Sequence, residues 1–224
     1  AVLDPNPNVA GGGVQALEEA GVRVRVGEGE KRAKLLMESY LKYVREGMPF
    51  VTAKFAMSLD GKIATHTGDS KWISGDKARW AVHGIRQVSD AIMVGINTVV
   101  ADNPQLTARD ERGRPRDRQP LRVIVDSRGR TPVNARMMSE PGETLVAVST
   151  ASPEVRGSLS EAGVKVVEAA ADDGSVDLTA LMRHLAVEQS VTSLCVEGGA
   201  SILGSLFDHG LVDKVIAFVA PTII

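Results

Sequence analysis

The feature that most constrains the fold of this chain is the repeated alternation of apolar runs with segments of helical periodicity. Runs of strand length that are apolar almost throughout occupy 90–95, 121–127, 143–150 and 192–197. Such strands are typical of a parallel sheet with helices on both faces, because neither face of the strand meets water. Right-handed crossovers then bring the carboxyl ends of the strands to one edge, where open α/β sheets bind ligands. The pattern therefore predicts an α/β fold with a mostly parallel sheet.

Further elements follow from periodicity. VRVRV at 22–26 alternates with period two, which predicts a half-buried strand, and 29–46 carries one apolar stripe that predicts a helix ended by Gly47. Ser74 is the predicted N-cap of a helix over about 75–88. The other expected strands are 49–57, 164–169 and 214–220, the other expected helices are 152–162, 176–188 and 200–210, and 103–120 is expected to be a loop.

Composition argues against several classes of function. The 224 residues carry a formal net charge of −2, so no global field favours nucleic acid or an anionic membrane. The arginines of 109–118 stand among acids without interleaved aromatic residues, which also argues against nucleic acid. No run approaches the ~18 apolar residues of a membrane span, and AVLDPNPNV at the start has no basic n-region, so no signal peptide is expected.

Cysteine and histidine usage bears on location and metals. The single cysteine, Cys195, lies in an apolar run and is expected to be a buried free thiol, which favours a reducing, cytoplasmic location. The four histidines are scattered, and no spacing typical of a zinc site occurs, so no metal ligand is predicted in this chain.

The stretch Glu197-Gly198-Gly199 ends a buried strand and precedes a helix. Glycines at such a turn let the backbone approach a ligand, and the helix N-terminus at Ala200 and Ser201 offers N–H groups that suit a phosphate. A tight turn without a ligand explains the glycines equally well. Glu197 favours a site, because a carboxylate at the end of a buried strand needs a polar partner, from a ligand or from an arginine of the protein.

Other polar residues have a structural and a functional interpretation. Lys54 in VTAKFA is either a solvated amine or a donor beside a cleft. Trp72 either packs in the core or forms a flat wall beside a ring. Arg86 and Arg109 carry the planar fork that matches phosphate oxygens, although Arg109 lies beside a mixed-charge run typical of a solvated loop.

The segment DSRGR, residues 126–130, follows a strand at the place where dinucleotide-binding folds recognise a ribose. Ser127 and the arginines suit the 2′-phosphate of NADP, whereas Asp126 is the kind of acid that binds the ribose of NAD. The spacing leaves both interpretations open.

Five motifs in order, KFAMSLDGKIA, GDSKWIS, GINTVVADNPQLTAR, RVIVDS and VEGGASILGSL, resemble the reductase domain of the bifunctional riboflavin-biosynthesis deaminase/reductase. The resemblance runs from about residue 49 to the end of the chain. It implies a dihydrofolate-reductase-like fold and the NADPH-dependent reduction of 5-amino-6-(5-phosphoribosylamino)uracil to 5-amino-6-(5-phosphoribitylamino)uracil. Members of this family continue past PTII, so the reductase domain, 49–224, is expected to be truncated at its C-terminal end.

Residues 1–48 resemble the closing segment of the cytidine-deaminase-like α/β domain of the same enzyme. The zinc motifs of that domain, a His-Ala-Glu and a Pro-Cys-x-x-Cys pair, are absent from the 224 residues. Zinc binding and deamination are therefore expected only of a natural protein that carries the missing part.

The resemblance also implies roles for single residues. Cofactor contacts fall on Ala56, Trp72, Thr98, Asp102, Ser127, Gly199, Ala200 and Ser201. Substrate contacts fall on Ser70, Arg86, Leu106, Arg109 and Glu197. Lys54 matches a lysine beside the nicotinamide and ribose, and Lys54 and Glu197 are the candidate catalytic groups for protonating the product nitrogen.

Two rival functions are kept open. One is another pteridine- or folate-type NADPH reductase on the same fold, which has no need for two phosphate-gripping arginines. The other is a binding module that kept the fold and lost activity. The family implies a homodimer or a larger homo-oligomer, whereas the sequence itself gives neither the oligomeric state nor the proton donor.

Overall fold

The computed structural model describes residues 2–66, 73 and 75–224 of the chain. The chain forms two compact units: residues 1–50 with 183–192, and residues 51–182 with 193–224. The predicted domain boundary at residue 49 lies close to this division. The origin of residues 1–48 in a deaminase domain stays a prediction.

The first unit carries the N-terminal helices. The helix predicted over 29–46 is present but is broken at Met37, whose φ of −109° departs from helical geometry. Gly47 ends it in the left-handed conformation with φ of 64°, as predicted. The helices of this unit are α1 (Gly12–Glu19), α2 (Glu30–Leu36) and α3 (Glu38–Glu46).

The strand predicted at 22–26 is wrong. These residues have no regular structure, and four of the five are exposed. An alternating pattern becomes a strand only where a neighbour takes its backbone hydrogen bonds, and within the described part of the chain no strand pairs with this segment.

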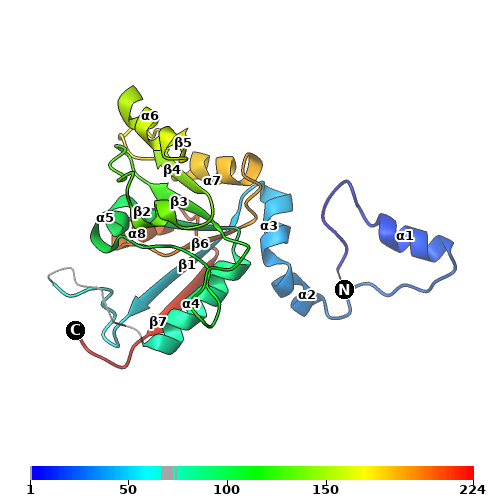
Figure 1. The fold of residues 1–224 in the computed structure, drawn as a ribbon. Coiled ribbons are helices and arrows are strands. Elements are labelled where there is room, and N and C mark those ends of the chain that lie inside the picture. The colour runs from blue at the N-terminus through cyan, green and yellow to red at the C-terminus, as the bar shows by residue number, and fades with distance from the viewer. Residues whose placement is uncertain (1, 67–72, 74) are drawn as a thin grey trace. The chain divides into compact units, whose positions relative to one another are not determined.

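The second unit is built on one sheet in the order β5-β4-β3-β2-β6-β1-β7. The pairs β1–β7, β2–β3, β2–β6, β3–β4 and β4–β5 are all parallel, which confirms the predicted mostly parallel sheet. Figure 1 shows β1 and β7 running side by side at one edge. The strands are β1 (Phe50–Met57), β2 (Ala91–Gly95), β3 (Leu121–Val125), β4 (Thr144–Val148), β5 (Lys165–Glu168), β6 (Ser193–Val196) and β7 (Lys214–Val219).

Helices cover both faces of this sheet, as predicted. The side chain of Val94 in β2 belongs to the same buried cluster as Val99. The next residue, Gly95, faces Ile202 instead, because a Cβ added to Gly95 would lie 3.7 Å from the Cβ of Ile202. Because successive residues of a strand point to opposite faces, the helices that carry Val99 and Ile202 lie on opposite faces. These helices are α5 (Ile96–Asp102) and α8 (Ala200–Asp208); the others are α4 (Asp76–Val88), α6 (Pro153–Glu161) and α7 (Leu178–Val187), with a short 3₁₀ helix, η1 (Arg136–Ser139).

The central strands explain the apolar runs of the sequence. Every residue of β4 is buried, and β2 and β3 are exposed in part only at their ends, whereas the edge strand β7 alternates between half-buried and exposed positions. The predicted N-cap Ser74 lies outside the described residues, and Gly75 stands directly before α4. The segment 103–120 is irregular apart from one bridge between Arg109 and Pro115, and η1 was not predicted.

No helix in the described part of the chain is both long enough and apolar enough to span a membrane.

Candidate functional site

Two adjoining hollows lie at the carboxyl ends of the parallel strands. The β1 hollow, about 410 Å³, is lined by Lys54 and Ala56 of β1, Thr98 and Asp102 of α5, and Glu197 to Ala200. The β3 hollow, about 280 Å³, is lined by Ser127 after β3, by Ser201 and Ser205 of α8, and by His209. Asn97, Thr98 and Gly199 line both hollows, so the glycine turn between β6 and α8 lies where the two meet.

The glycines of this turn are required by close packing. A Cβ on Gly198 would lie 3.1 Å from the Oγ1 of Thr98 and 3.2 Å from the Cβ of Val94. Gly199 has a positive φ of 25° and precedes α8, whose first residues Ala200 and Ser201 line the hollows. The turn therefore presents bare backbone and a helix N-terminus to both hollows.

Glu197 has its polar partner in Arg86 of α4. The Arg86 Nε donates to Oε1 at 2.7 Å and Nη2 donates to Oε2 at 2.8 Å, a bidentate ion pair. The Glu197 side chain is 5% exposed and the Arg86 side chain 15% exposed. The sequence left open whether Glu197 pairs with a ligand or with an arginine of the protein. The structure pairs it with Arg86, which lies 111 residues away in sequence.

The protonation state of Glu197 follows from this pair. Burial alone raises the pKa of a carboxyl group, but the Arg86 charge and its hydrogen bonds, with the nearby Lys54 charge, outweigh burial and lower the pKa of Glu197. The pKa of Arg86 is raised by Glu197 in spite of burial. Glu197 is therefore an ionised acceptor at neutral pH, which argues against it as the proton donor.

Arg86 and Arg109 are brought together at Thr107 rather than inside either hollow. The Arg86 Nη1 donates to the carbonyl oxygen of Thr107 at 3.1 Å, and the Arg109 Nε donates to its Oγ1 at 2.9 Å. His83 of α4 also donates from Nδ1 to this carbonyl at 3.1 Å. Thr107 and His83 were not among the predicted site residues, and no motif in the sequence marks them.

Leu106 precedes this cluster in a conformation that a leucine rarely adopts. Its φ is 52°, and the residue as a whole is 3% exposed within the buried cluster. A left-handed conformation costs a non-glycine residue about 1–2 kcal/mol. The substrate contact that the resemblance implies for Leu106 stays a prediction, because the residue is almost completely buried in this structure.

Lys54 lies on the same side of the site as Glu197. Its Nζ lies 5.5 Å from the centre of the Phe218 ring of β7, within cation–π range. The Lys54 charge also lowers the pKa of the Cys195 thiol, but burial outweighs this effect and raises that pKa to about 12. Cys195 is a buried free cysteine, as predicted.

Burial distinguishes the two residues that the sequence offered as ribose contacts in DSRGR, Asp126 and Ser127. Asp126 is fully buried, and its Oδ2 accepts from the backbone N–H and the hydroxyl of Thr131, both at 2.7 Å. Asp126 therefore holds the loop 127–131 and has no surface exposed to a ligand in this structure. Ser127 lines the β3 hollow, and Arg130 reaches Asn97 Oδ1, which lines both hollows, at 3.4 Å.

The predicted site residues thus fall into three groups. Lys54, Ala56, Thr98, Asp102, Glu197, Gly199 and Ala200 line the β1 hollow, and Ser127 and Ser201 line the β3 hollow together with Thr98 and Gly199. Arg86, Leu106 and Arg109 lie around Thr107, joined to the β1 hollow through the Arg86–Glu197 pair. Ser70 and Trp72 lie outside the described residues.

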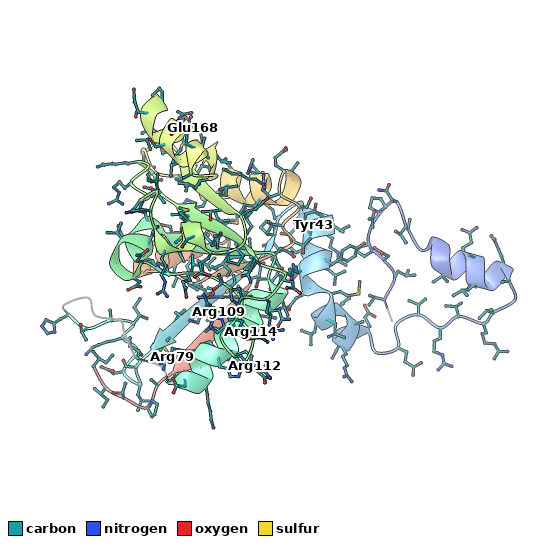
Figure 2. The ribbon with its side chains drawn as sticks, viewed as in Figure 1. Tyr43, Arg79, Arg109, Arg112, Arg114 and Glu168 are labelled. Atoms are coloured by element: carbon teal, nitrogen blue, oxygen red, sulfur yellow. The ribbon has the colours of Figure 1, made fainter. Side chains whose placement is uncertain are left out.

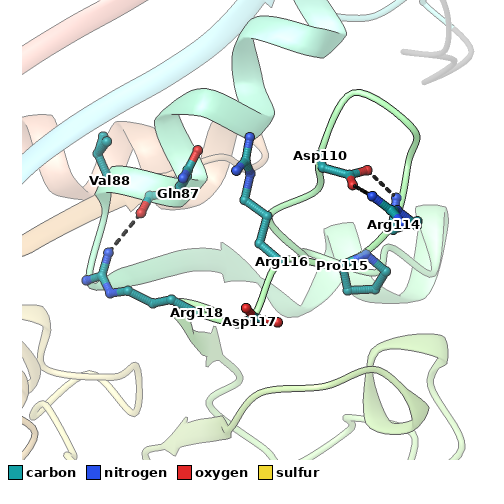
Figure 3. A pocket seen from close by; sticks show the side chains of 8 residues that line it. All are labelled: Gln87, Val88, Asp110, Arg114, Pro115, Arg116, Asp117 and Arg118. Carbon is teal, nitrogen blue, oxygen red and sulfur yellow. Dashed lines mark hydrogen bonds and ion pairs between the residues drawn. The ribbon is translucent and has the colours of Figure 1, made fainter.

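A third hollow, about 790 Å³, lies elsewhere, between the end of α4 and the loop 110–118 (Figure 3). Its arginines are partly neutralised: Arg114 pairs with Asp110 at 2.7 Å and Arg118 with Asp90 at 2.6 Å. Figure 2 labels Arg109, Arg112 and Arg114 on this part of the molecule. None of the predicted site residues lines this hollow, and its mixed charge gives no reason to assign it a ligand.

Within the described residues, no group of three or more histidine, cysteine, aspartate or glutamate side chains is placed to hold a metal ion.

The fold and the adjoining hollows define an α/β protein that binds a ligand at the carboxyl edge of a parallel sheet. Comparison with known families gives the particular one. Residues 49–224 match the model of the RibD C-terminal domain, and the chain belongs to this family.

Relatives of known name agree with this assignment. The chain is 41% identical over 222 residues to the riboflavin biosynthesis protein RibD of Chlamydia trachomatis, covering 98% of this chain and 58% of the relative. It is 36% identical to RibD of Aquifex aeolicus, covering 100% of this chain and 60% of the relative. The chain thus spans about three fifths of the length of these curated relatives.

Solved structures show the same fold. Acinetobacter baumannii RibD superposes with a TM-score of 0.87 at 38% identity, covering 100% of this chain and 60% of that one. A Thermotoga maritima protein described as a diaminohydroxyphosphoribosylaminopyrimidine deaminase/5-amino-6-(5-phosphoribosylamino)uracil reductase superposes with a TM-score of 0.80 at 36% identity, covering 98% and 58%.

Proposed function

We propose that this chain performs the NADPH-dependent reduction of 5-amino-6-(5-phosphoribosylamino)uracil to 5-amino-6-(5-phosphoribitylamino)uracil in riboflavin biosynthesis. The observation that carries the proposal is the pair of hollows that meet at the glycine turn, one beside Lys54 and Glu197 and the other beside Ser127. An extended site of this form suits a dinucleotide beside a small polar substrate. The family and the reductase described for the Thermotoga maritima relative support the same reaction.

The residues around the glycine turn fit a nicotinamide dinucleotide. Gly199 and the start of α8 provide backbone N–H groups suited to a pyrophosphate, and Thr98 adds a hydroxyl at the meeting point. Ser127, with Arg130 nearby, would hold a 2′-phosphate, because the competing acid Asp126 is buried on Thr131. This arrangement favours NADPH over NADH. When bound, NADPH supplies a hydride.

The other proposed cofactor contacts line the β1 hollow. Ala56 of β1 leaves room beside Lys54, and Asp102 follows Thr98 by one turn of α5, so both residues point into the same hollow. Trp72 is proposed for the same cofactor on the strength of the family resemblance.

The substrate is a phosphorylated ribosylamine, and the chain's own charges match its parts. The Arg86–Glu197 pair orients a carboxylate that accepts hydrogen bonds from a substrate hydroxyl or ring N–H beside the β1 hollow. Arg109 would bind the 5′-phosphate at the substrate's far end, and Ser70 and Leu106 complete the proposed contacts. Holding the phosphate fixes the reacting carbon without taking part in the bond changes.

Reduction of the ring-opened substrate also requires a proton at the amine nitrogen. Lys54 is the proposed donor, because it is a cation that lines the β1 hollow, whereas the lowered pKa of Glu197 keeps that residue ionised. Glu197 acts in this scheme by accepting hydrogen bonds and holding the substrate in place.

The test is the loss of NADPH absorbance with the phosphoribosylamino-uracil, using the full-length protein. Arg109→Ala is expected to raise KM for substrate at least tenfold while the Kd for NADPH changes less than twofold, and Arg112→Ala, an exposed arginine of the same loop, serves as the matched control. Reduction of a pteridine or folate at equal efficiency would support the rival reductase. No saturable NADPH binding would support the inactive binding module.

We further propose that the natural protein is a homodimer or larger homo-oligomer in the cytoplasm, with a zinc-dependent deaminase activity carried by sequence outside these 224 residues. The Thermotoga maritima relative, described as both deaminase and reductase, supports this second activity.

A further inference from the structure

Glu140, directly after η1, holds the guanidinium of Arg109 at Nη2, whereas Thr107 binds it at Nε. Its carboxylate accepts from the Arg109 Nη2, which lies 3.2 Å from each oxygen, and from the side-chain amide of Gln105. The Glu140 side chain is 15% exposed and that of Arg109 is 20% exposed, so the contact is largely shielded from water.

Arg109 is held by all three of its nitrogens. Besides the Nη2 contact with Glu140, its Nε donates to Thr107 Oγ1 at 2.9 Å and its Nη1 donates to the carbonyl oxygen of Gly113 at 2.7 Å. A guanidinium has five N–H groups, so at most two are left for an anionic ligand. Because the side chain is already fixed, binding an anion costs little rotamer entropy.

The main chain around Glu140 is itself anchored by a buried arginine. Arg122 of β3 is 2% exposed, and it donates to the carbonyl oxygens of Gly142 at 2.6 Å, Pro141 at 3.1 Å and Glu140 at 3.4 Å. Burial lowers the pKa of Arg122, and the Glu140 charge opposes that effect. A buried charge is costly unless it is fully hydrogen-bonded. All three hydrogen bonds from Arg122 to main-chain oxygens go to residues 140–142, so they fix the segment that carries Glu140.

We propose that Glu140 is a positioning residue that fixes the Arg109 guanidinium for the 5′-phosphate of the substrate, with Arg122 anchoring the segment 140–142 behind it. This proposal rests on the role proposed above for Arg109. A carboxylate in this place acts by geometry rather than by attraction, since its charge by itself repels a phosphate.

The test compares steady-state kinetics of Glu140→Ala and Glu140→Gln in the full-length protein, on substrate with and without its 5′-phosphate. Glu140→Ala is expected to raise KM for the phosphorylated substrate about tenfold, with kcat and the Kd for NADPH changed less than twofold. Glu140→Gln, which keeps an acceptor, is expected to recover part of this loss. Neither variant is expected to change kcat/KM for the dephosphorylated substrate.

The matched control is Glu143→Ala, which removes an exposed carboxylate three residues further on that pairs with Lys165 at 2.8 Å. Glu143→Ala is expected to leave KM and kcat/KM unchanged for both the phosphorylated and the dephosphorylated substrate. Combining Arg109→Ala with Glu140→Ala is expected to raise KM no further than Arg109→Ala alone, because the two residues act through one contact.

Two kinds of failure are distinguishable. If Arg109→Ala leaves KM unchanged, the proposed role of Arg109 fails. If Arg109→Ala raises KM while Glu140→Ala leaves it unchanged, lowers it, or affects both substrates equally, the positioning role of Glu140 is overturned.

Discussion

The buried pair of Arg86 and Glu197 offers a direct test of what stabilises the site. Glu197→Leu would leave the Arg86 guanidinium with its side chain 15% exposed and without its carboxylate partner. Removal of one partner of a buried pair costs about 3–5 kcal/mol, because the remaining charge is left uncompensated. For a domain of this size such a loss lowers the Tm by roughly 6–20 °C.

Replacing both partners is expected to cost less than replacing one. Two apolar side chains of similar volume avoid the desolvation of both charges, so an Arg86→Met, Glu197→Leu double variant is expected to be at least about 2 kcal/mol more stable than Glu197→Leu alone. Glu143→Gln, which breaks an exposed pair with Lys165, is the control and should cost less than about 1 kcal/mol.

The pair also has a defined pH dependence. The folded-state pKa of Glu197 is lowered below its ordinary value of 4.5. Its contribution to stability is therefore fully present above the unfolded-state pKa and is lost as the pH falls through the folded-state pKa. The stability difference between the unmodified chain and Glu197→Leu should be constant near neutral pH and shrink below about pH 4.5.

Urea unfolding of the unmodified chain and the three variants between pH 3 and 7 measures both effects, and the m-value must stay constant for the comparison to hold. The reasoning is refuted if the double variant is no more stable than Glu197→Leu, or if the pH profile of Glu197→Leu matches that of the unmodified chain.

Three further predictions concern single residues of the site. Gly198→Ala should destabilise the chain by about 1–3 kcal/mol in urea unfolding, because its Cβ would meet α5 at 3.1 Å, whereas Gly204→Ala in open space on α8 should stabilise it by up to ~1 kcal/mol; similar effects of the two would contradict the packing argument. Cys195, with its pKa raised to about 12, should react with iodoacetamide at pH 8 about 10³-fold more slowly than a free thiol, and rapid labelling of the folded chain would refute its burial. Lys54→Met should lower kcat roughly 10²-fold with little change in the Kd for NADPH, and an unchanged kcat would remove Lys54 as proton donor.

The sheet could be predicted from the sequence because its strands carry their own signal. The runs at 90–95, 121–127 and 143–150 are mostly apolar because they form the buried centre of the sheet. The same reasoning failed at 22–26. An alternating pattern indicates which side chains would share one face of a strand, but it does not show that a neighbouring strand is present. The break at Met37 was likewise invisible in a continuous apolar stripe.

Apart from the positions that the family resemblance implied, residues of the candidate site stood out in the sequence only through their local chemistry, as the glycine turn and Glu197 did. Glu197 stood out as a carboxylate at the end of a buried strand, but its partner Arg86 lies on another element, and spacing does not reveal which arginine turns toward it. Glu140 and Thr107 act through contacts between distant segments and carry no local pattern. The left-handed conformation of Leu106 is imposed by its surroundings, since leucine has no preference for it.

The strand order has a consequence for how the molecule is made. β1 is the first strand of the sheet to leave the ribosome, yet its neighbours are β6 and β7, the last two. The strand that carries Lys54 therefore stays unpaired while more than a hundred residues are translated. Lys54 and Glu197 can come together only after β6 has been synthesised. Contacts so remote in sequence form slowly, so a nascent chain stalled before β6 should hold β2 to β5 as a partial sheet and should possess no complete β1 hollow.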